Sequence, residues 1–179
     1  MTKLLIFGQK IKIEDLTHLL GLLVQLNENR TEFWIFKEYL DELPEDLQNK
    51  YKDKTWATYE DIIRIRPGCL LSLGGDGTIS QAVTLVRDSK VPILGINMGR
   101  LGFLASIEKK LIPDAIYQLV NGSYEVEERS LLKLDSTENL FGEIPIALND
   151  FTILKRDNSS MITIHTYING DFLNSYWAD

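Results

Sequence analysis

The sequence predicts an α/β protein, with a Rossmann-like parallel sheet domain over residues 1–123 and the start of an all-β, β-sandwich-like domain over residues 124–179. Two observations support this prediction. As far as Gly122, short apolar runs alternate with helix-like stretches, which is typical of a parallel sheet with helices on both faces. Beyond Tyr124, apolar and polar residues alternate with a period of two and the helical pattern stops.

The first half of the chain supplies the strands and helices in turn. Residues 3–8 (KLLIFG) are an apolar run that ends in glycine and predict a buried strand. Leucines at three- and four-residue spacing predict a helix over residues 16–26, with Glu14 and Asp15 at its positive end. Residues 31–36 (TEFWIF) predict a second strand, and residues 37–52 predict helical pieces that break before Pro44.

The next elements follow the same alternation. Residues 69–73 (CLLSL) and 91–96 (VPILGI) predict strands around a helix over residues 78–88. Residues 112–122 predict a helix with Pro113 in its first turn and Gly122 as its cap. Period-two runs over residues 124–136, 143–155 and 161–179 predict strands, and Asn169–Asp171 (NGD) predicts a hairpin. The sequence ends inside the last run, so we expect the all-β domain to be incomplete.

Composition limits the classes of partner. The net charge is −7, and its field disfavours nucleic acid and anionic membranes as partners. Cys69 is the one cysteine, so the chain has no internal disulfide, which fits the cytoplasm. We expect Cys69 to be a small buried residue rather than a reactive thiol, and no apolar run is long enough to cross a bilayer.

A glycine-rich turn follows the strand at residues 69–73. Gly74, Gly75 and Gly77 allow close approach of an anion to backbone N–H groups, and Thr78 can cap the helix or reach a phosphate. The turn lacks the Lys of a P-loop and the spacing of a dinucleotide fingerprint. Asp76 occupies its mouth, where a carboxylate could hold Mg²⁺ or accept a proton from an attacking hydroxyl. The alternative is a plain N-capping aspartate.

A second glycine-rich turn, residues 95–106 (GINMGRLGFLAS), follows the next strand. Turns after adjacent parallel strands meet at the carboxyl edge of the sheet, where ligands bind. Arg100 could supply positive charge and Phe103 could stack on a base. The alternatives are a solvated Arg100 and a Phe103 in the core.

The two turns together resemble the NAD kinases. GGDGT alone is shared with diacylglycerol and sphingosine kinases, and a close variant occurs in 6-phosphofructokinases, whereas GINMGRLGFLA is much more specific to NAD kinases. ALND at residues 147–150, EERSLLKL at residues 127–134 and YWAD at residues 176–179 resemble further motifs of that family. The resemblance extends from about Leu70 to the end, and more loosely to residues 3–8.

The resemblance implies that ATP phosphorylates the 2′-hydroxyl of the adenosine ribose of NAD, giving NADP. It implies Asp76 as the general base, with the glycine turn along the phosphates and Mg²⁺ offsetting their charge. It also implies a homo-oligomer, a dimer or tetramer. The residues expected to bind the nucleotides are Gly74, Gly75, Asp76, Gly77, Thr78, Asn97, Phe103, Asn149, Asp150 and Asp179.

Three departures from the family pattern leave alternatives open. Asp150 stands where the family has Glu, Trp177 stands where a basic residue is usual, and the family's Thr-Gly-Ser-Thr-Ala-Tyr stretch lies beyond this sequence. The alternatives are a lipid kinase that shares the first turn and a nucleotide-binding fragment without catalysis. We expect the isolated 179-residue chain to be inactive. The sequence assigns no metal ligands.

Overall fold

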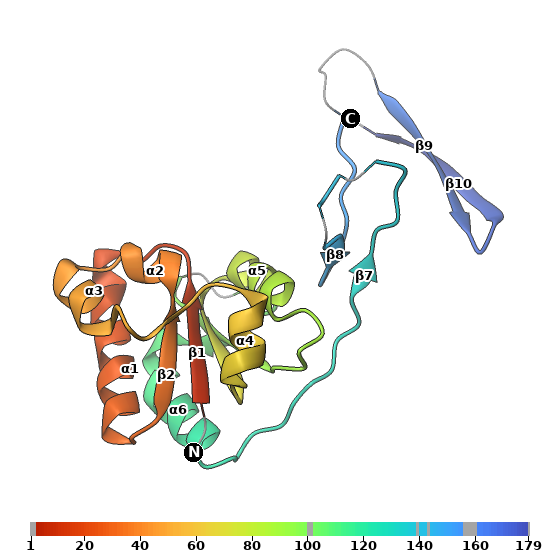
Figure 1. The fold of residues 1–179 in the computed structure, drawn as a ribbon. Coiled ribbons are helices and arrows are strands. Elements are labelled where there is room, and N and C mark those ends of the chain that lie inside the picture. The colour runs from red at the N-terminus through yellow and green to blue at the C-terminus, as the bar shows by residue number, and fades with distance from the viewer. Residues whose placement is uncertain (1–2, 100–101, 139, 143, 156–160, 179) are drawn as a thin grey trace.

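The computed structural model describes residues 3–99, 102–138, 140–142, 144–155 and 161–178. Its N-terminal part is a doubly wound α/β unit around one parallel sheet (Figure 1). The strand order is β3-β2-β1-β4-β5-β6. The strands are β1 (Lys3–Gly8), β2 (Glu32–Phe36), β3 (Thr55–Trp56), β4 (Cys69–Gly74), β5 (Ile93–Asn97) and β6 (Ile107–Glu108).

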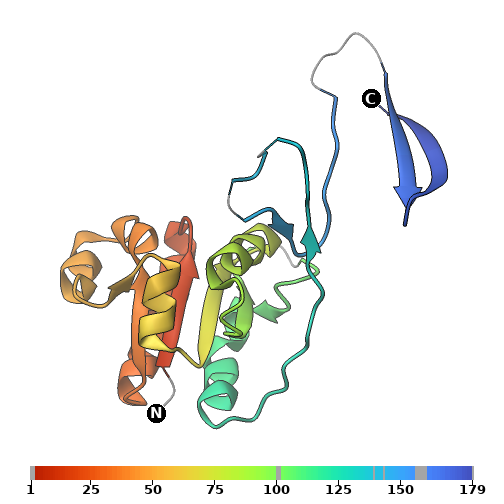
Figure 2. The same cartoon turned by 45° about the vertical axis from the view of Figure 1, so that its right-hand side comes forward.

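Helices cover both faces of the sheet (Figure 2). Helices α1 (Leu16–Glu28) and α6 (Ile112–Val120) pack together on one face, and α4 (Tyr59–Ile65) and α5 (Asp76–Val86) pack together on the other. Right-handed crossovers from β1 to β2 and from β4 to β5 run in opposite directions along the sheet, which places α1 and α5 on opposite faces. The remaining helical segments are η1 (Ile13–Asp15), α2 (Lys37–Asp41), α3 (Glu45–Tyr51) and η2 (Lys109–Leu111).

The core lies around the two central strands. Every residue of β1 after Lys3 is buried, and Leu4, Leu5 and Ile6 pair in register with Cys69, Leu70 and Leu71 of β4. Strands that helices cover on both faces need apolar side chains at successive positions, which is why these runs are continuous rather than alternating. An aromatic cluster of Phe7, Phe36 and Trp56 closes the β2–β3 side, with ring centroids 5.0 to 6.2 Å apart.

The structure confirms the predicted alternation and also contains strands and a helix that were not predicted. The strands at β3 and β6 have two residues each, too few to produce a periodic pattern. Helix α4 is also unpredicted, although Thr58 and Asp61 form a capping box at its start. Cys69 is buried as expected, and its burial raises the pKa of the thiol to about 12.

The C-terminal part extends away from the α/β unit (Figure 1). An exposed stretch over residues 123–131 leads to a small antiparallel pair, β7 (Leu132–Lys133) and β8 (Ile146–Ala147). These strands are much shorter than the period-two runs predicted. The hairpin is confirmed: β9 (Ile162–Ile168) and β10 (Asp171–Ala178) pair around Asn169 and Gly170, whose φ angles of 52° and 93° suit a tight two-residue turn.

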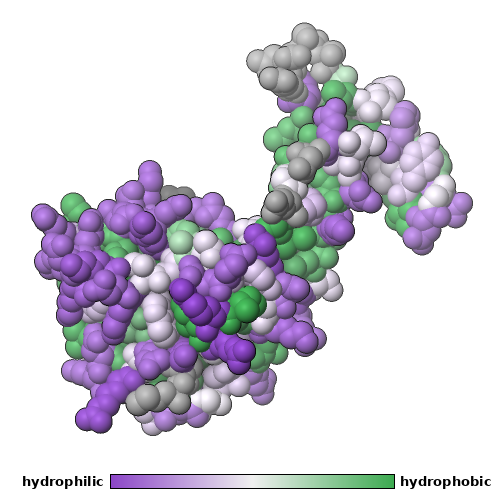
Figure 3. Space-filling view, in the orientation of Figure 1, coloured by the Kyte–Doolittle hydropathy of each residue, from purple (hydrophilic) through white to green (hydrophobic). Residues whose placement is uncertain are grey.

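Apolar side chains lie on the surface of this C-terminal part (Figure 3). Tyr167 and Phe172 are each more than half exposed and contact each other edge to face across the hairpin. Trp177 is 75% exposed. In contrast, the large apolar side chains of the parallel sheet are almost all buried, so only the N-terminal unit has a closed core of its own among the described residues.

Candidate functional site

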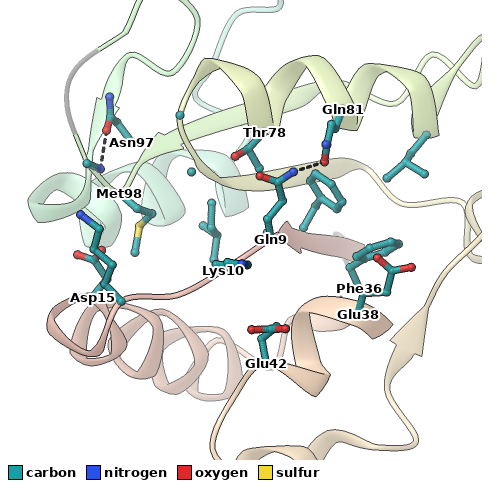
Figure 4. A pocket seen from close by; sticks show the side chains of 18 of the residues that line it. Gln9, Lys10, Asp15, Phe36, Glu38, Glu42, Thr78, Gln81, Asn97 and Met98 are labelled. Atoms are coloured by element: carbon teal, nitrogen blue, oxygen red, sulfur yellow. Dashed lines mark hydrogen bonds between the residues drawn. The ribbon is translucent and has the colours of Figure 1, made fainter. Parts of the chain in front are cut away.

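A cavity of about 990 Å³ opens at the carboxyl edge of the parallel sheet. The strand order reverses between β1 and β4, because the chain moves outward from β1 to β3 and then returns to the other side of β1. At such a reversal the loops after the two strands diverge and leave a crevice, which is where α/β proteins bind ligands. The cavity is lined by residues that follow β1, β2, β4 and β5 (Figure 4).

The first glycine turn forms one wall of this cavity. Gly75 is the N-cap of α5, and Gly74, Gly75 and Thr78 line the cavity. The side chain of Thr78 lies directly against Gly74, so that any Cβ at position 74 would overlap its hydroxyl. Glycine at position 74 is therefore what allows Thr78 to fold back over the turn.

The carboxylate of Asp76 is turned away from its own helix and toward the second glycine turn. Its Oδ2 accepts a hydrogen bond from the N–H of Phe103 at 2.7 Å, and its Oδ1 accepts from Leu104 at 2.9 Å and Ala105 at 3.0 Å. These donors, Ala105 foremost, hold the pKa of the Asp76 carboxyl below its ordinary value. The N-capping alternative is wrong, because the cap of α5 is Gly75 and makes no side-chain hydrogen bond.

A second residue, Asn97, fixes the base of the same turn. Asn97 is 3% exposed at the end of β5; its Oδ1 accepts from the N–H of Gly99 at 2.8 Å, and its Nδ2 donates to the carbonyl of Ala105 at 3.4 Å. Asp76 and Asn97 therefore hold the turn from two sides. Gly102 approaches the Asp76 carboxylate so closely that a Cβ there would overlap it.

The comparisons with known proteins agree with this geometry. Residues 16–124 match the family described as the ATP-NAD kinase N-terminal domain. This match covers more than half of the chain and includes both glycine turns. The chain belongs to the NAD kinase family. The helices and strands that build the cavity from α1 onward all lie within the matched region.

Relatives named NAD kinase match almost the whole chain. The protein of Cytophaga hutchinsonii is 40% identical over 173 residues, which is 96% of this chain and 59% of that protein. The protein of Flavobacterium johnsoniae is 38% identical over 179 residues, 99% of this chain and 60% of that protein. The chain thus spans about 60% of the length of these NAD kinases.

The fold is also similar to that of a solved structure, yeast NADH kinase complexed with NADH. The TM-score is 0.68 at 18% identity, and the match covers 100% of this chain and 56% of that chain. The identity is low, so this likeness supports the fold: a parallel sheet unit followed by small antiparallel sheets.

The structure brings some of the predicted site residues together and leaves others apart. Gly74, Gly75, Thr78 and Asn97 line the cavity, whereas Asp76, Gly77, Phe103, Asn149 and Asp150 do not. Phe103 is 97% exposed, so its alternative placement in the core is wrong. Arg100 and Asp179 lie outside the described residues.

The predicted pair on the C-terminal part has contacts of its own. Asn149 and Asp150 are exposed just after β8. The side-chain amide of Asn149 donates to Asp150 Oδ1 at 3.2 Å, and the hydroxyl of Thr152 donates to Asp150 Oδ2 at 3.1 Å. The two residues therefore present one carboxylate whose orientation is fixed by its neighbours.

Sequence reasoning missed the cavity residues after β1 and β2. Gln9, Lys10 and Lys12 follow β1, Glu38 lies on α2, and Glu42 is the C-cap of that helix. Gln9 donates a hydrogen bond to Gln81 of α5 across the cavity edge (Figure 4). The signal was present, since polar residues that directly follow the first strand of a doubly wound sheet lie at its reversal point.

Two further findings concern metals and membranes. The described part of the chain has no group of three or more His, Cys, Asp or Glu side chains placed to hold a metal ion. None of the helices within the described residues is long and apolar enough to cross a membrane.

Proposed function

We propose that this protein acts as an NAD kinase, transferring the γ-phosphoryl group of ATP to the 2′-hydroxyl of the adenosine ribose of NAD. The observation that carries the proposal is the Asp76 carboxylate, held by three N–H groups next to a cavity wall that can take a phosphate chain. Family membership supports the same activity. No observation favours the lipid kinase alternative.

The hydrogen bonds of Asp76 define how it would act. Two carboxylate oxygens offer about four acceptor positions. Three are filled by the described backbone donors, with only one of these on Oδ2. Oδ2 is therefore the atom that would accept the hydrogen bond of the NAD 2′-hydroxyl. The lowered pKa keeps the carboxylate ionised at neutral pH, in the form that accepts a proton.

In the proposed reaction the 2′-oxygen attacks the γ-phosphorus of ATP. A new P–O bond forms to the ribose, the bond to the β-phosphate oxygen breaks, and ADP leaves. The hydroxyl proton passes to Asp76 and then to solvent. A carboxylate of low pKa is a weak base, so we expect proton transfer to come late and orientation of the hydroxyl to be the larger contribution. Mg²⁺ enters with ATP as part of the substrate.

The NAD molecule would be held between the two parts of the chain. Phe103, whose N–H donates to the Asp76 carboxylate, offers an exposed ring for the adenine, and Asn149 and Asp150 offer an oriented amide and carboxylate for ribose hydroxyls. Asp179 is proposed to face NAD as well. We also propose a cytoplasmic homo-oligomer, supported by the apolar side chains exposed on the β9–β10 hairpin and by the buried, unpaired Cys69.

The decisive experiment is an assay for NADP formed from ATP, Mg²⁺ and NAD. Because the chain spans about 60% of its relatives, the assay uses both this chain and a chimera in which the remaining sequence of the Cytophaga hutchinsonii protein follows it. We expect NADP from the chimera and at least a hundredfold slower formation from the chimera carrying Asp76→Asn, roughly the loss of a general base. Diacylglycerol in place of NAD should give no product. If the chimera fails while the Cytophaga hutchinsonii protein is active, the proposed function is wrong.

A further inference from the structure

Asn97 lies where the two glycine turns meet. It ends β5 in register with Gly74, the last residue of β4, and the N–H of Met98 donates to the Gly74 carbonyl at 3.4 Å. The Asn97 side chain is buried although it belongs to the cavity lining. Both of its polar atoms bind the second turn, Oδ1 at Gly99 and Nδ2 at Ala105, and Figure 4 shows the bond at Oδ1. The amide of Asn97 is therefore engaged by the protein itself.

Ala105 connects this amide to the Asp76 carboxylate. Its carbonyl accepts from Asn97, and its N–H donates to Asp76 Oδ1 at 3.0 Å. Ala105 is fully buried, and a Cβ on Gly95 of β5 would lie only 3.1 Å from the Ala105 Cα. One residue, packed closely on β5, therefore carries a hydrogen bond to each of the two side chains.

Building on the proposed function, we propose that Asn97 is a positioning residue for phosphoryl transfer, which acts through Ala105 on the direction of the Asp76 carboxylate rather than by binding a nucleotide. Leu104 and Ala105 donate to Oδ1 and fix that oxygen, which leaves Oδ2 directed at the proposed position of the 2′-hydroxyl. If Ala105 shifts, the carboxylate can rotate and the hydroxyl is no longer held in line with the γ-phosphate. Alignment of this kind supplies much of phosphoryl-transfer catalysis.

The electrostatics of Asp76 give this arrangement a measurable signature. The N–H of Ala105 is foremost among the groups that lower the pKa of the Asp76 carboxyl, followed by those of Phe103 and Leu104, and desolvation opposes them. No charged side chain of the described residues is among the causes of the shift. Loss of the hydrogen bond from Ala105 should therefore raise the pKa of Asp76 toward its ordinary value.

The first test uses the 179-residue chain without any nucleotide, so its outcome does not depend on kinase activity. Asn97→Leu keeps the approximate size of the side chain and removes both hydrogen bonds. Carbon-detected NMR titration should show an upward shift in the pKa of the Asp76 carboxyl, and hydrogen exchange at the amide of Ala105 should become faster. Asn97→Ser, with a shorter polar side chain, should shift the pKa in the same direction, and it carries the test if the leucine variant does not fold.

Ile116→Val is the matched control for lost stability. Ile116 is buried in α6, which packs with α1 on the face of the sheet opposite α5. Removal of a buried methyl group weakens the same core but leaves both glycine turns in place. The titration of Asp76 in this variant should match that of the parent.

The second test separates positioning from binding in the chimera used for the kinase assay. Asn97→Leu should lower kcat roughly ten- to hundredfold, as for a small misplacement of reacting groups, and leave the KM values of ATP and NAD near those of the parent. A nucleotide ligand would instead raise KM with kcat nearly unchanged, and that result overturns the proposal.

The two tests fail separately. Parental titration of Asp76 together with parental exchange at Ala105 in folded Asn97 variants overturns the positioning role, whatever the chimera does. A chimera that makes no NADP refutes the proposed function, and the NMR comparison still decides whether Asn97 fixes the carboxylate.

Discussion

The Asp76 carboxylate has a structural role in addition to its proposed role as the general base. Its oxygens accept the N–H groups of three successive residues, 103 to 105, and so fix the path of the second glycine turn. The side chain of Asn97 fixes the same turn from β5. The Phe103 side chain is exposed to solvent, and the backbone around it is fixed by hydrogen bonds to the side chains of Asp76 and Asn97. The two glycine turns form one unit although they follow different strands.

The Asp76→Asn substitution tests this double role. An amide keeps one oxygen acceptor but places an NH₂ group against backbone donors, so part of the turn is released. We expect faster hydrogen exchange at the amides of Phe103, Leu104 and Ala105 than in the parent. In the active chimera we expect kcat to fall by about 10²–10⁴, as for the loss of a general base. Parental exchange rates at the three amides would contradict the structural role.

Gly102 gives a second test that leaves the carboxylate in place. A Cβ at position 102 would overlap Asp76, so Gly102→Ala should push the turn away from it. Overpacking of this kind costs about 1–3 kcal/mol. Gly77→Ala is the control, because a Cβ there meets no atom within 4 Å. We expect urea denaturation to show destabilisation for Gly102→Ala and a neutral or slightly stabilised Gly77→Ala.

Asp150 is one of the residues at which the sequence departs from the family pattern, and it predicts a separate effect on binding of the acceptor NAD. Its carboxylate is oriented by Asn149 and Thr152. Loss of a charge-assisted hydrogen bond costs about 1.5–3 kcal/mol. Asp150→Ala in the chimera should therefore raise the NAD dissociation constant roughly tenfold or more and leave that of ATP unchanged, while Asp150→Glu should be tolerated. Equal NAD affinity in calorimetry would make the pair merely structural.

At the scale of elements, an ion pair joins the segment before α1 to the segment before α6. Lys109 of η2 reaches Asp15 of η1, which is 3% exposed and also lines the cavity. Asp15 raises the pKa of Lys109 above its ordinary value of 10.5. The helices that follow the two segments, α1 and α6, pack against each other, so the pair closes one end of that helical layer.

The sign of this shift predicts an effect at alkaline pH. A base whose folded pKa is raised stabilises the folded state fully below its unfolded pKa and loses that stabilisation as pH rises through the folded pKa. The parent should therefore lose stability above about pH 10.5 more steeply than Lys109→Met. Lys110→Met, at an exposed pair with Glu108, serves as the control. Thermal melts between pH 8 and 11 measure the difference, and parallel curves for all three proteins would argue against the pair.

The elements differ in how far they could be predicted. Strands such as residues 69–74 are long, apolar and followed by glycines, so periodicity locates them. Strands β3 and β6 have two residues each and exist only because a neighbouring strand pairs with them, which is tertiary information. The hairpin was predictable because Asn169 and Gly170 favour the positive φ angles that its turn requires.

The candidate site was also predictable only in part: its local motif could be predicted, but its long-range contacts could not. Glycines and an aspartate after a strand indicate an anion site, and the structure places Gly74, Gly75 and Thr78 on a cavity. The sequence does not predict that the Asp76 carboxylate accepts hydrogen bonds from residues 103–105. This contact depends on how two loops far apart in the sequence approach each other. The cavity residues after β1 were missed although their place directly after the first strand is a sequence signal, because the signal has meaning only once the reversal of strand order beside β1 is recognised.

For the whole molecule, the exposed stretch that follows the compact α/β unit predicts where a protease cleaves the chain first. Residues 123–131 are exposed and belong to no helix or strand in the structure. Limited proteolysis should cleave there first, because proteases need an extended, accessible backbone. We expect a resistant fragment ending within residues 123–131, consistent with domains at 1–123 and 124–179, and rapid loss of the remainder. Mass spectrometry identifies the cut, and early cleavage within α1 to α6 would contradict the division.

The central position of β1 has a consequence for how the protein is made. Because β1 pairs with both β2 and β4, β1 gains its second neighbour only after residues 69–74 have been synthesised. Domains fold largely as units during synthesis. One edge of β1 therefore stays unpaired until the chain has been synthesised as far as β4. The same pairing brings the loops after β1 and β4 to opposite walls of the cavity. Pairing of β1 with β4 therefore joins the two halves of the sheet and begins the cavity, and the residues that follow β5 complete that cavity later in synthesis.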